Sequence, residues 1–182
     1  MEKKYILTDE TIEYLGHTLH RIKAVKDFAT ISAGTLGGYV ESETNLDHTG
    51  AAWVYENAKV SGDAVVSGAA RVTDDALVTD SARVSGDARV TDSARVTDSA
   101  RVTGDALVSG AADFAVISGF GRVFRTTTFF RCKDNLVRCQ CGCFYGSIEE
   151  FRAKVRETHG NSKYAKEYLM IADLMELHFK ED

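Results

Sequence analysis

The residues best suited to chemistry lie towards the C-terminus, where basic, aromatic and thiol side chains occur together. Residues 115–145 carry a net charge of +4, although the whole chain carries −5. Guanidinium groups bind phosphate oxygens as a fork, and aromatic rings stack on planar ligands. The segment therefore predicts a site for a small anionic, nucleotide-like ligand or for a partner protein. The candidate residues are Arg122, Arg125, Arg131, Lys133, Arg138, Phe124 and Phe130.

The same composition also has a purely structural interpretation. The arginines could pair with acidic groups elsewhere in the chain while the phenylalanines close the end of a neighbouring domain. In either case the negative overall charge argues against duplex DNA as a partner, because neutralising its phosphates requires a broad basic surface.

All four cysteines lie within residues 132–143. Alternate side chains on a regular strand are roughly 7 Å apart, whereas zinc holds its thiolates at about 2.3 Å. Only a bulge at Gly142 could gather them, so we predict buried free thiols and no metal. A cluster of this kind does not resemble an extracellular disulfide framework, which favours a reducing cytoplasm. The only metal candidates are Cys139, Cys141, Cys143 and His159, with Cys132 lying across a turn.

Catalytic residues cannot be assigned from the sequence. No histidine occurs between residues 49 and 158. His17 and His20 would face opposite sides of a strand and make a poor metal pair. The abundant Ser and Thr residues recur at equivalent places, which indicates a structural role. We therefore predict a protein without enzymatic activity and without a cofactor.

A repetitive stretch must position the C-terminal residues. The unit Ala-x-Val recurs every six residues from Ala52 to Phe114, eleven times without a gap, with Phe replacing Val in the last unit. In a strand, the Ala and the Val share one face and the residue between them points away. The remaining three places hold turn-forming residues. A period this short is typical of a solenoid whose repeats are stable only when stacked.

The segment Val60-Ser-Gly-Asp-Ala64 and its copies resemble the bacterial hexapeptide repeat. This resemblance implies a left-handed parallel β-helix with three hexads in each triangular coil, assembled as a homotrimer. With eighteen residues per coil, Arg71 stacks on Arg89 and Arg83 on Arg101, roughly 4.8 Å apart. Acyltransferases, carbonic anhydrases and binding proteins share this pattern, so the fold alone does not give the function.

Two further segments resemble proteins of bacteriophages and prophages. They are Leu-Gly-Gly-Tyr-Val-Glu-Ser-Glu at residues 36–43 and Trp-Val-Tyr-Glu-Asn-Ala-Lys-Val at residues 53–60. Cys-Gly-Cys-Phe-Tyr-Gly-Ser at residues 141–147 resembles a recurring C-terminal module of the same proteins. The resemblance implies a phage origin and a location in the host cytoplasm, without naming an activity.

The fold expected is mainly β, in four parts. An N-terminal β-hairpin cap (1–27) precedes a β-helix solenoid (28–124, with regular hexads over 52–114), a basic, aromatic, Cys-containing hairpin (125–145) and a helical segment (146–182) with two helices. A capping box at Ser147 and Glu150 begins the first helix, and Gly160 ends it. The sequence has no run of eighteen apolar residues, so we predict no membrane span. It has no apolar run at its N-terminus, so we predict no signal peptide.

Three functions remain open at this stage. The favoured one is a non-catalytic, phage-type protein that binds or sequesters a host protein or a small anionic, nucleotide-like ligand, for example in counter-defence. The second is a degenerate hexapeptide acyltransferase that uses His48 or His159 as its base. The third is a structural or virion-associated spacer, which would bind no ligand.

Overall fold

Ten strands of two residues each build the parallel solenoid, and every one consists of an outward residue followed by an inward valine. The structure is a computed structural model and describes residues 2–180. The strands are β4 (Trp53–Val54), β5 (Lys59–Val60), β6 (Val65–Val66), β7 (Arg71–Val72), β8 (Leu77–Val78), β9 (Arg83–Val84), β10 (Arg89–Val90), β11 (Arg95–Val96), β12 (Arg101–Val102) and β13 (Leu107–Val108).

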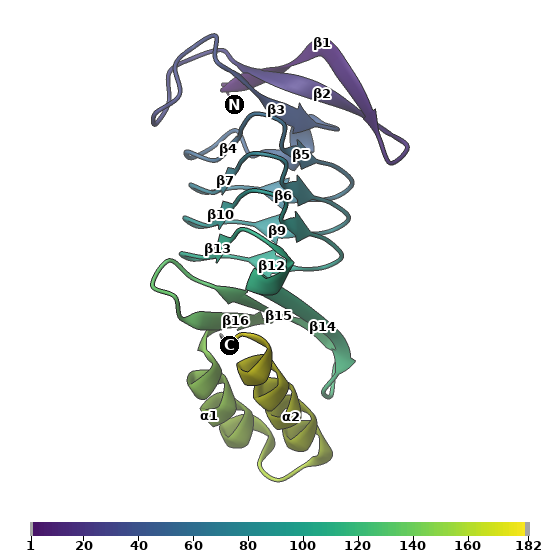
Figure 1. Ribbon diagram of the computed structural model, residues 1–182, viewed down its shortest axis with the longest axis vertical. Coiled ribbons are helices and arrows are strands. Elements are labelled where there is room, and N and C mark those ends of the chain that lie inside the picture. Colours follow the sequence, from purple (N-terminus) through teal and green to yellow (C-terminus); the bar gives the residue numbers. More distant parts are fainter. Residues whose placement is uncertain (1, 181–182) are drawn as a thin grey trace.

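Strands eighteen residues apart pair in parallel, which confirms the predicted coil length. Trp53 aligns with Arg71, Arg71 with Arg89, and Arg89 with Leu107, giving the sheet β4-β7-β10-β13. The other two sides of the solenoid are β5-β8-β11 and β6-β9-β12. Figure 1 shows the coils stacked along the long axis of the molecule.

Alanine and valine fill the interior of the solenoid, as the pattern predicts. From Ala52 to Val108, every Ala-x-Val pair is fully buried. The backbone of one coil donates to the next, as in the hydrogen bond of 2.9 Å from Arg71 N to Ala88 O. Small side chains let the three walls approach closely, and each coil buries an apolar edge that it could not bury alone.

Each regular corner needs one residue in the left-handed region of backbone space. Asp and Gly occupy this place, for example Asp74 (φ 60°), Asp92 (φ 55°) and Gly86 (φ 70°), except at the first corner, where Glu56 does so (φ 50°). Both residue types tolerate that conformation better than most others. At the Asp corners the preceding threonine donates to the carboxylate, as Thr91 does to Asp92 at 2.9 Å.

The N-terminal end of the solenoid is covered by a β-hairpin, as expected. Strands β1 (Tyr5–Tyr14) and β2 (His17–Ala24) pair in antiparallel fashion around Leu15 and Gly16. Strand β3 (Leu36–Val40) then joins β2 to β5, so that the hairpin extends one wall of the solenoid. A single 3₁₀ turn, η1 (Glu43–Asn45), follows β3.

The solenoid ends earlier than the sequence indicates, and its predicted boundary at residue 124 is wrong. Parallel pairing stops at Val108, and the 3₁₀ turn η2 (Ala111–Asp113) leads the chain away. The amides of Ser109 and Gly110 donate to the Asp113 carboxylate, which closes this turn. The eleventh repeat is therefore not a coil side, and Ala112 is exposed.

An antiparallel sheet then lies across the end of the solenoid. Its strands are β14 (Phe114–Phe120), β15 (Arg125–Arg131), β16 (Val137–Cys141) and β17 (Phe144–Ser147), paired in that order. The predicted hairpin corresponds to β15 and β16, and the structure adds a strand on each side. Phe130 and Cys132 pack into the solenoid core, whereas Phe129 and Cys139 pack against the helices. The sheet thus separates two hydrophobic cores.

Two helices cover the outer face of this sheet (Figure 1). They are α1 (Ile148–His159) and α2 (Lys163–His178). The capping box is confirmed, because Glu150 N donates to Ser147 Oγ and Ser147 N donates to the Glu150 carboxylate. Neither helix has the length and apolar content needed to cross a bilayer.

Candidate functional site

Three of the predicted ligand-binding cations are paired with acidic residues of the protein. Lys133 Nζ contacts the Asp87 carboxylate at 2.6 Å and the Asp87 carbonyl at 2.8 Å. Arg138 forms a fork with Asp134, at 2.9 and 2.6 Å. Arg131 pairs with Asp113 at 3.3 Å. Because their charges are compensated within the protein, we assign these residues to a structural role.

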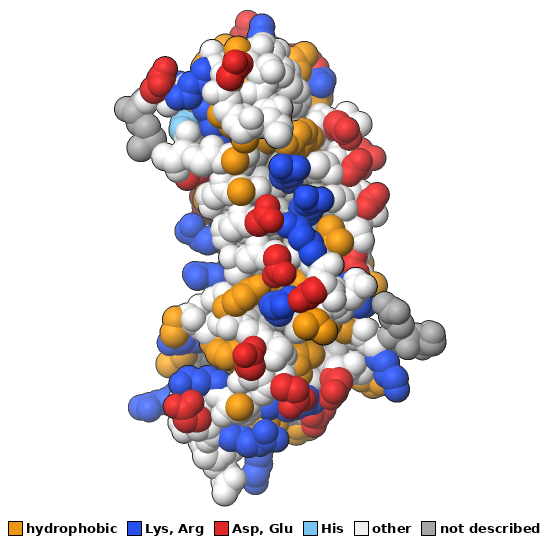
Figure 2. Space-filling model, turned by 90° about the vertical axis from the view of Figure 1, so that its left-hand side faces the viewer, with side chains coloured by type: hydrophobic (Ala, Val, Ile, Leu, Met, Phe, Trp, Pro, Cys, Tyr) orange, Lys and Arg blue, Asp and Glu red, His pale blue; other side chains and the backbone are white. Residues whose placement is uncertain are grey.

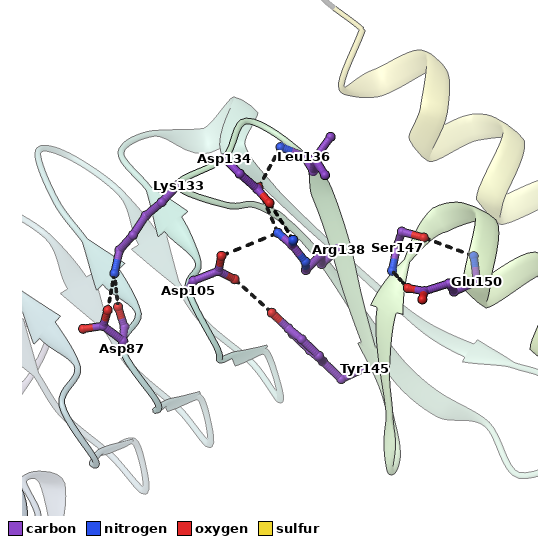
Figure 3. Close-up of polar contacts among 9 residues, drawn as sticks. All are labelled: Asp87, Asp105, Lys133, Asp134, Leu136, Arg138, Tyr145, Ser147 and Glu150. Carbon is purple, nitrogen blue, oxygen red and sulfur yellow. Dashed lines mark hydrogen bonds and ion pairs between the residues drawn. The ribbon is translucent and has the colours of Figure 1, made fainter.

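Asp105 extends the junction from the last complete coil (Figure 3). Its carboxylate accepts a hydrogen bond from the Tyr145 hydroxyl at 3.1 Å and lies 3.7 Å from Arg138. Arg138 also lowers the pKa of Asp134 to about 2, mainly through their hydrogen bonds. The prediction that Phe130 stacks on a ligand is wrong, because this ring is fully buried at the end of the solenoid core.

The four cysteines are unpaired and do not converge. Cys132 and Cys139 lie in different cores, and Cys143 is exposed in the turn between β16 and β17. Burial raises the pKa of Cys132 to about 11 and also raises that of Cys139, so both thiols stay protonated at neutral pH. Among residues 2–180, a geometry suited to a metal occurs only at Asp105, Cys132 and Asp134, where the Arg138 guanidinium already contacts both carboxylates.

A pocket of about 340 Å³ lies between the sheet and the two helices. The β14–β15 hairpin contributes two arginines and a valine. The β16–β17 hairpin contributes two cysteines and an aromatic ring, and the helices supply the rest. The lining residues are Arg122, Val123, Arg125, Cys141, Cys143, Phe144, Phe151, Lys154, Val155, Thr158, His159 and Tyr168.

The positive charge on the arginine side of this pocket is not compensated by acidic residues. The side chains of Arg122 and Arg125 form no hydrogen bond or ion pair with any residue that the structure describes. Lys154 is paired with Glu157 at 3.0 Å, but this pair is largely exposed and contributes little. No carboxylate occurs among the described residues that line the pocket. The pocket therefore favours a negatively charged ligand.

Aromatic side chains form the apolar part of the pocket. The rings of Phe144 and Phe151 lie 5.7 Å apart, and Phe151 meets Tyr168 edge-on at 5.7 Å. His159 stacks on Tyr168, with the ring centroids 5.8 Å apart and the planes at 28°. The Tyr168 hydroxyl donates to Phe120 O at 3.3 Å. Burial raises the pKa of Tyr168 to about 12, so it stays neutral beside the arginines.

The sequence found only part of this pocket. Arg122, Arg125 and His159 were among the predicted site or metal residues, whereas Phe124 is 72% exposed in the same turn and does not line the pocket. Lys154, Thr158 and Tyr168 were missed, because the helices were interpreted as a cover for the coils. Their positions depend on how α1 and α2 pack on the sheet, which the apolar stripe of a helix does not specify.

His48, the other predicted base, lies in the N-terminal cap, at the opposite end of the solenoid from the pocket. Its ring stacks on Tyr5 at 4.3 Å, and its Nε2 atom is buried without a hydrogen-bond partner among the described residues. Burial lowers the pKa of His48. This arrangement packs the imidazole into the cap and does not present it to a substrate.

A comparison with known protein families finds a match within the coils. A family model described as the YdcK β-solenoid repeat matches residues 82–98. These residues carry the fully buried alanines and valines described above. Over this stretch the coils are similar to the YdcK β-solenoid repeat, in keeping with the hexapeptide pattern of the sequence. One hexapeptide-repeat relative, the uncharacterized acetyltransferase YdcK of Escherichia coli strain K12, is 44% identical over 50 residues. The match covers 27% of this chain and spans only 15% of that protein.

Proposed function

We propose that the protein binds a small anionic ligand with a planar apolar part in the pocket beneath the C-terminal sheet. The observation that supports this most is the pair Arg122 and Arg125, which lack internal partners at a pocket whose described lining contains no carboxylate. Both side chains are exposed, so their guanidinium groups are free to bind an anion beside the apolar wall of the pocket. The hexapeptide solenoid then serves as a rigid support for the pocket.

The two ends of such a ligand would meet different surroundings. An anionic group would lie near Arg122 and Arg125, whose planar forks suit phosphate or carboxylate oxygens. A ring would lie beside Phe144, Phe151 and Tyr168. The volume of about 340 Å³ is at the lower end for ligand sites. A mononucleotide therefore fits the proposal better than a dinucleotide.

A role without catalysis accompanies this proposal. Among the described residues that line the pocket, neither Cys141 nor Cys143 forms a hydrogen bond with the imidazole of His159, so no activated nucleophile is evident there. Unpaired thiols support a reducing compartment. A phage origin and the sequestering of a host ligand remain part of the proposal, and they rest on the sequence resemblance.

Calorimetric titration with mononucleotides tests the binding function. We expect binding by the wild type, with loss of the phosphate (the matching nucleoside) reducing affinity. Arg122→Gln and Arg125→Gln should each cost about 1.5–3 kcal/mol, or roughly ten- to hundredfold in Kd. Arg95→Gln is the matched control, because Arg95 is an exposed arginine on the coils. Equal affinities for the Arg125 and Arg95 variants would refute the pocket as the binding site.

A second candidate function, acyl transfer, is favoured by the name of the YdcK relative. His159 is the only histidine among the described lining residues, and it would have to act as the base. An assay for release of free CoA from acetyl-CoA with an acceptor decides between the two functions. Turnover that is lost in His159→Gln, while nucleotide binding is unchanged, would replace the binding proposal with acyl transfer.

A further inference from the structure

A second, smaller concavity lies on the other side of the C-terminal sheet, where the coils meet β16. It has a volume of about 160 Å³ and is lined by Arg83, Ser85, Arg101, Thr103 and Gln140. Arg83 and Arg101 are register partners on neighbouring coils, so their backbones lie roughly 4.8 Å apart. Thr128, the register partner of Gln140, accepts a hydrogen bond from Arg101 N. The concavity is therefore shaped by the junction between solenoid and sheet.

The two arginines form a stack of like charges without compensation. Neither guanidinium has a hydrogen bond or ion pair with any residue between 2 and 180. Both guanidinium-bearing side chains line the same concavity, so their charges repel one another, and an anion that bridges them relieves the repulsion. Figure 2 shows basic and acidic side chains interspersed along one face of the coils.

The corner beside this stack differs from the Asp corners in its chemistry. At the Asp corners a threonine hydroxyl donates to the following carboxylate, as Thr97 does to Asp98. Ser85 and Thr103 are instead followed by Gly86 and Gly104, and their hydroxyls contact each other at 3.1 Å. One hydroxyl hydrogen of this pair therefore remains available for a ligand.

The next acidic residues along the two coils, Asp87 and Asp105, bind other partners and do not pair with Arg83 or Arg101. Asp87 is bound by Lys133 at 2.6 Å. Asp105 accepts from Tyr145 and lies beside Arg138. Their charges are thus compensated at the junction shown in Figure 3. What remains near Arg83 and Arg101 is a concavity with two cations, two hydroxyls and an amide.

We propose that this concavity binds a tetrahedral oxyanion, namely a phosphate or sulfate group. Two guanidinium forks and a hydroxyl supply charge-assisted donors to such an anion. The volume of about 160 Å³ is sufficient for one tetrahedral group. The site is independent of the pocket beneath the sheet, because it lies on the solenoid side and shares no lining residue with it.

Calorimetric titration with inorganic phosphate, in a chloride buffer of constant ionic strength, tests this inference. We expect binding by the wild type and at least a tenfold increase of Kd in Arg83→Gln and in Arg101→Gln. Arg95→Gln should bind as the wild type does, because Arg95 stacks on Leu77 and not on another arginine. The site is overturned if no phosphate binds, or if the Arg101 and Arg95 variants bind phosphate equally.

Two further measurements complete the test. Titrations with sulfate and with glycerol 3-phosphate identify the source of the group: equal affinities indicate a free oxyanion, and tighter binding of the ester indicates a phosphorylated molecule. Without phosphate, Arg101→Gln should raise the melting temperature relative to Arg95→Gln, because it removes a like-charge contact. A lower melting temperature would contradict the unrelieved repulsion on which the proposal rests.

Discussion

The guanidinium of Arg125 lies against Gly142, in the space that a β-carbon at residue 142 would occupy. Gly142 is in the two-residue turn between β16 and β17, where Cys141 pairs with Phe144, and its φ is +61°. A glycine is thus needed both for the backbone of the turn and for the position of the arginine. This contact determines where one of the two unpaired cations of the pocket lies.

The first prediction concerns this contact. Gly142→Ala should displace Arg125 and weaken mononucleotide binding about tenfold, since the fork no longer meets the anion. It should also reduce stability by about 1 kcal/mol through the left-handed backbone. Gly34→Ala is the control, because Gly34 has a φ of +88° with open space around it. If both variants bind with wild-type affinity, Arg125 does not act as proposed.

The second prediction concerns the buried amino group of Lys4. This side chain is 1% exposed, and its Nζ donates to Ala52 O at 2.9 Å. Burial lowers the pKa of Lys4 from 10.5 to about 8. Below pH 8 the group is charged in both the folded and the unfolded state, so the cost of burying the charge is constant. As pH rises from 8 to 10.5 the folded state loses the proton first, and stability increases.

This dependence can be measured by chemical denaturation. Relative to Lys4→Met, the wild type should gain up to about 3 kcal/mol of unfolding free energy between pH 7 and 10.5. The comparison cancels the contribution of neighbouring groups such as Tyr5. Lys26→Met, which alters an exposed ion pair with Glu2, should show no such trend. A parallel pH profile for wild type and Lys4→Met would show that Lys4 keeps an ordinary pKa.

The third prediction concerns the corners of the solenoid. Asp92 has a φ of 55°, so Asp92→Ala should be less stable than Asp92→Gly by about 1 kcal/mol. Both variants lose the contact with Thr91, so their difference isolates the backbone. Asp75→Ala serves as a control, because Asp75 is exposed and lies outside the left-handed region. Equal stability of the two Asp92 variants in thermal unfolding would contradict this account.

The fourth prediction is the homotrimer that the hexapeptide resemblance implies. One chain has a mass of 19.9 kDa, so sedimentation equilibrium should give about 60 kDa. The exposed face β6-β9-β12 carries the Arg83–Arg101 stack. If that face lies outside the subunit contact, adding phosphate should not change the mass measured by sedimentation. A mass of one chain at micromolar concentration would remove the trimer from the proposal.

The repeat could be predicted from sequence because its physics is local. Ala and Val at spacing two, followed by corner residues, specify a buried face and a turn within six residues, and the stacking follows. The hand of the solenoid does not follow from the period, and it stays a prediction from the resemblance. The eleventh repeat shows the limit of the pattern: Ala112 has the right residue type, but the bonds from Ser109 and Gly110 to Asp113 lead the chain out of the coil.

The candidate site was harder to predict because it depends on contacts between distant segments. Composition marked seven residues between Arg122 and Arg138, and it did not separate those that bind Asp87, Asp113 or Asp134 from those without partners. The difference is set by position along the sheet, since Arg125 and Arg131 are the two ends of the same strand, β15, and only Arg131 meets Asp113. Lys154 and Tyr168 reach the pocket from helices whose placement no local pattern specifies.

The identical register of the coils has a consequence for the dimensions of the molecule. Removing or adding eighteen residues within the regular repeats restores the same corners, walls and buried rows. The distance between the N-terminal hairpin and the C-terminal pocket can therefore change only in steps of roughly 4.8 Å, one coil at a time. The length of the solenoid can therefore evolve by whole coils while the structures at both of its ends stay unaltered.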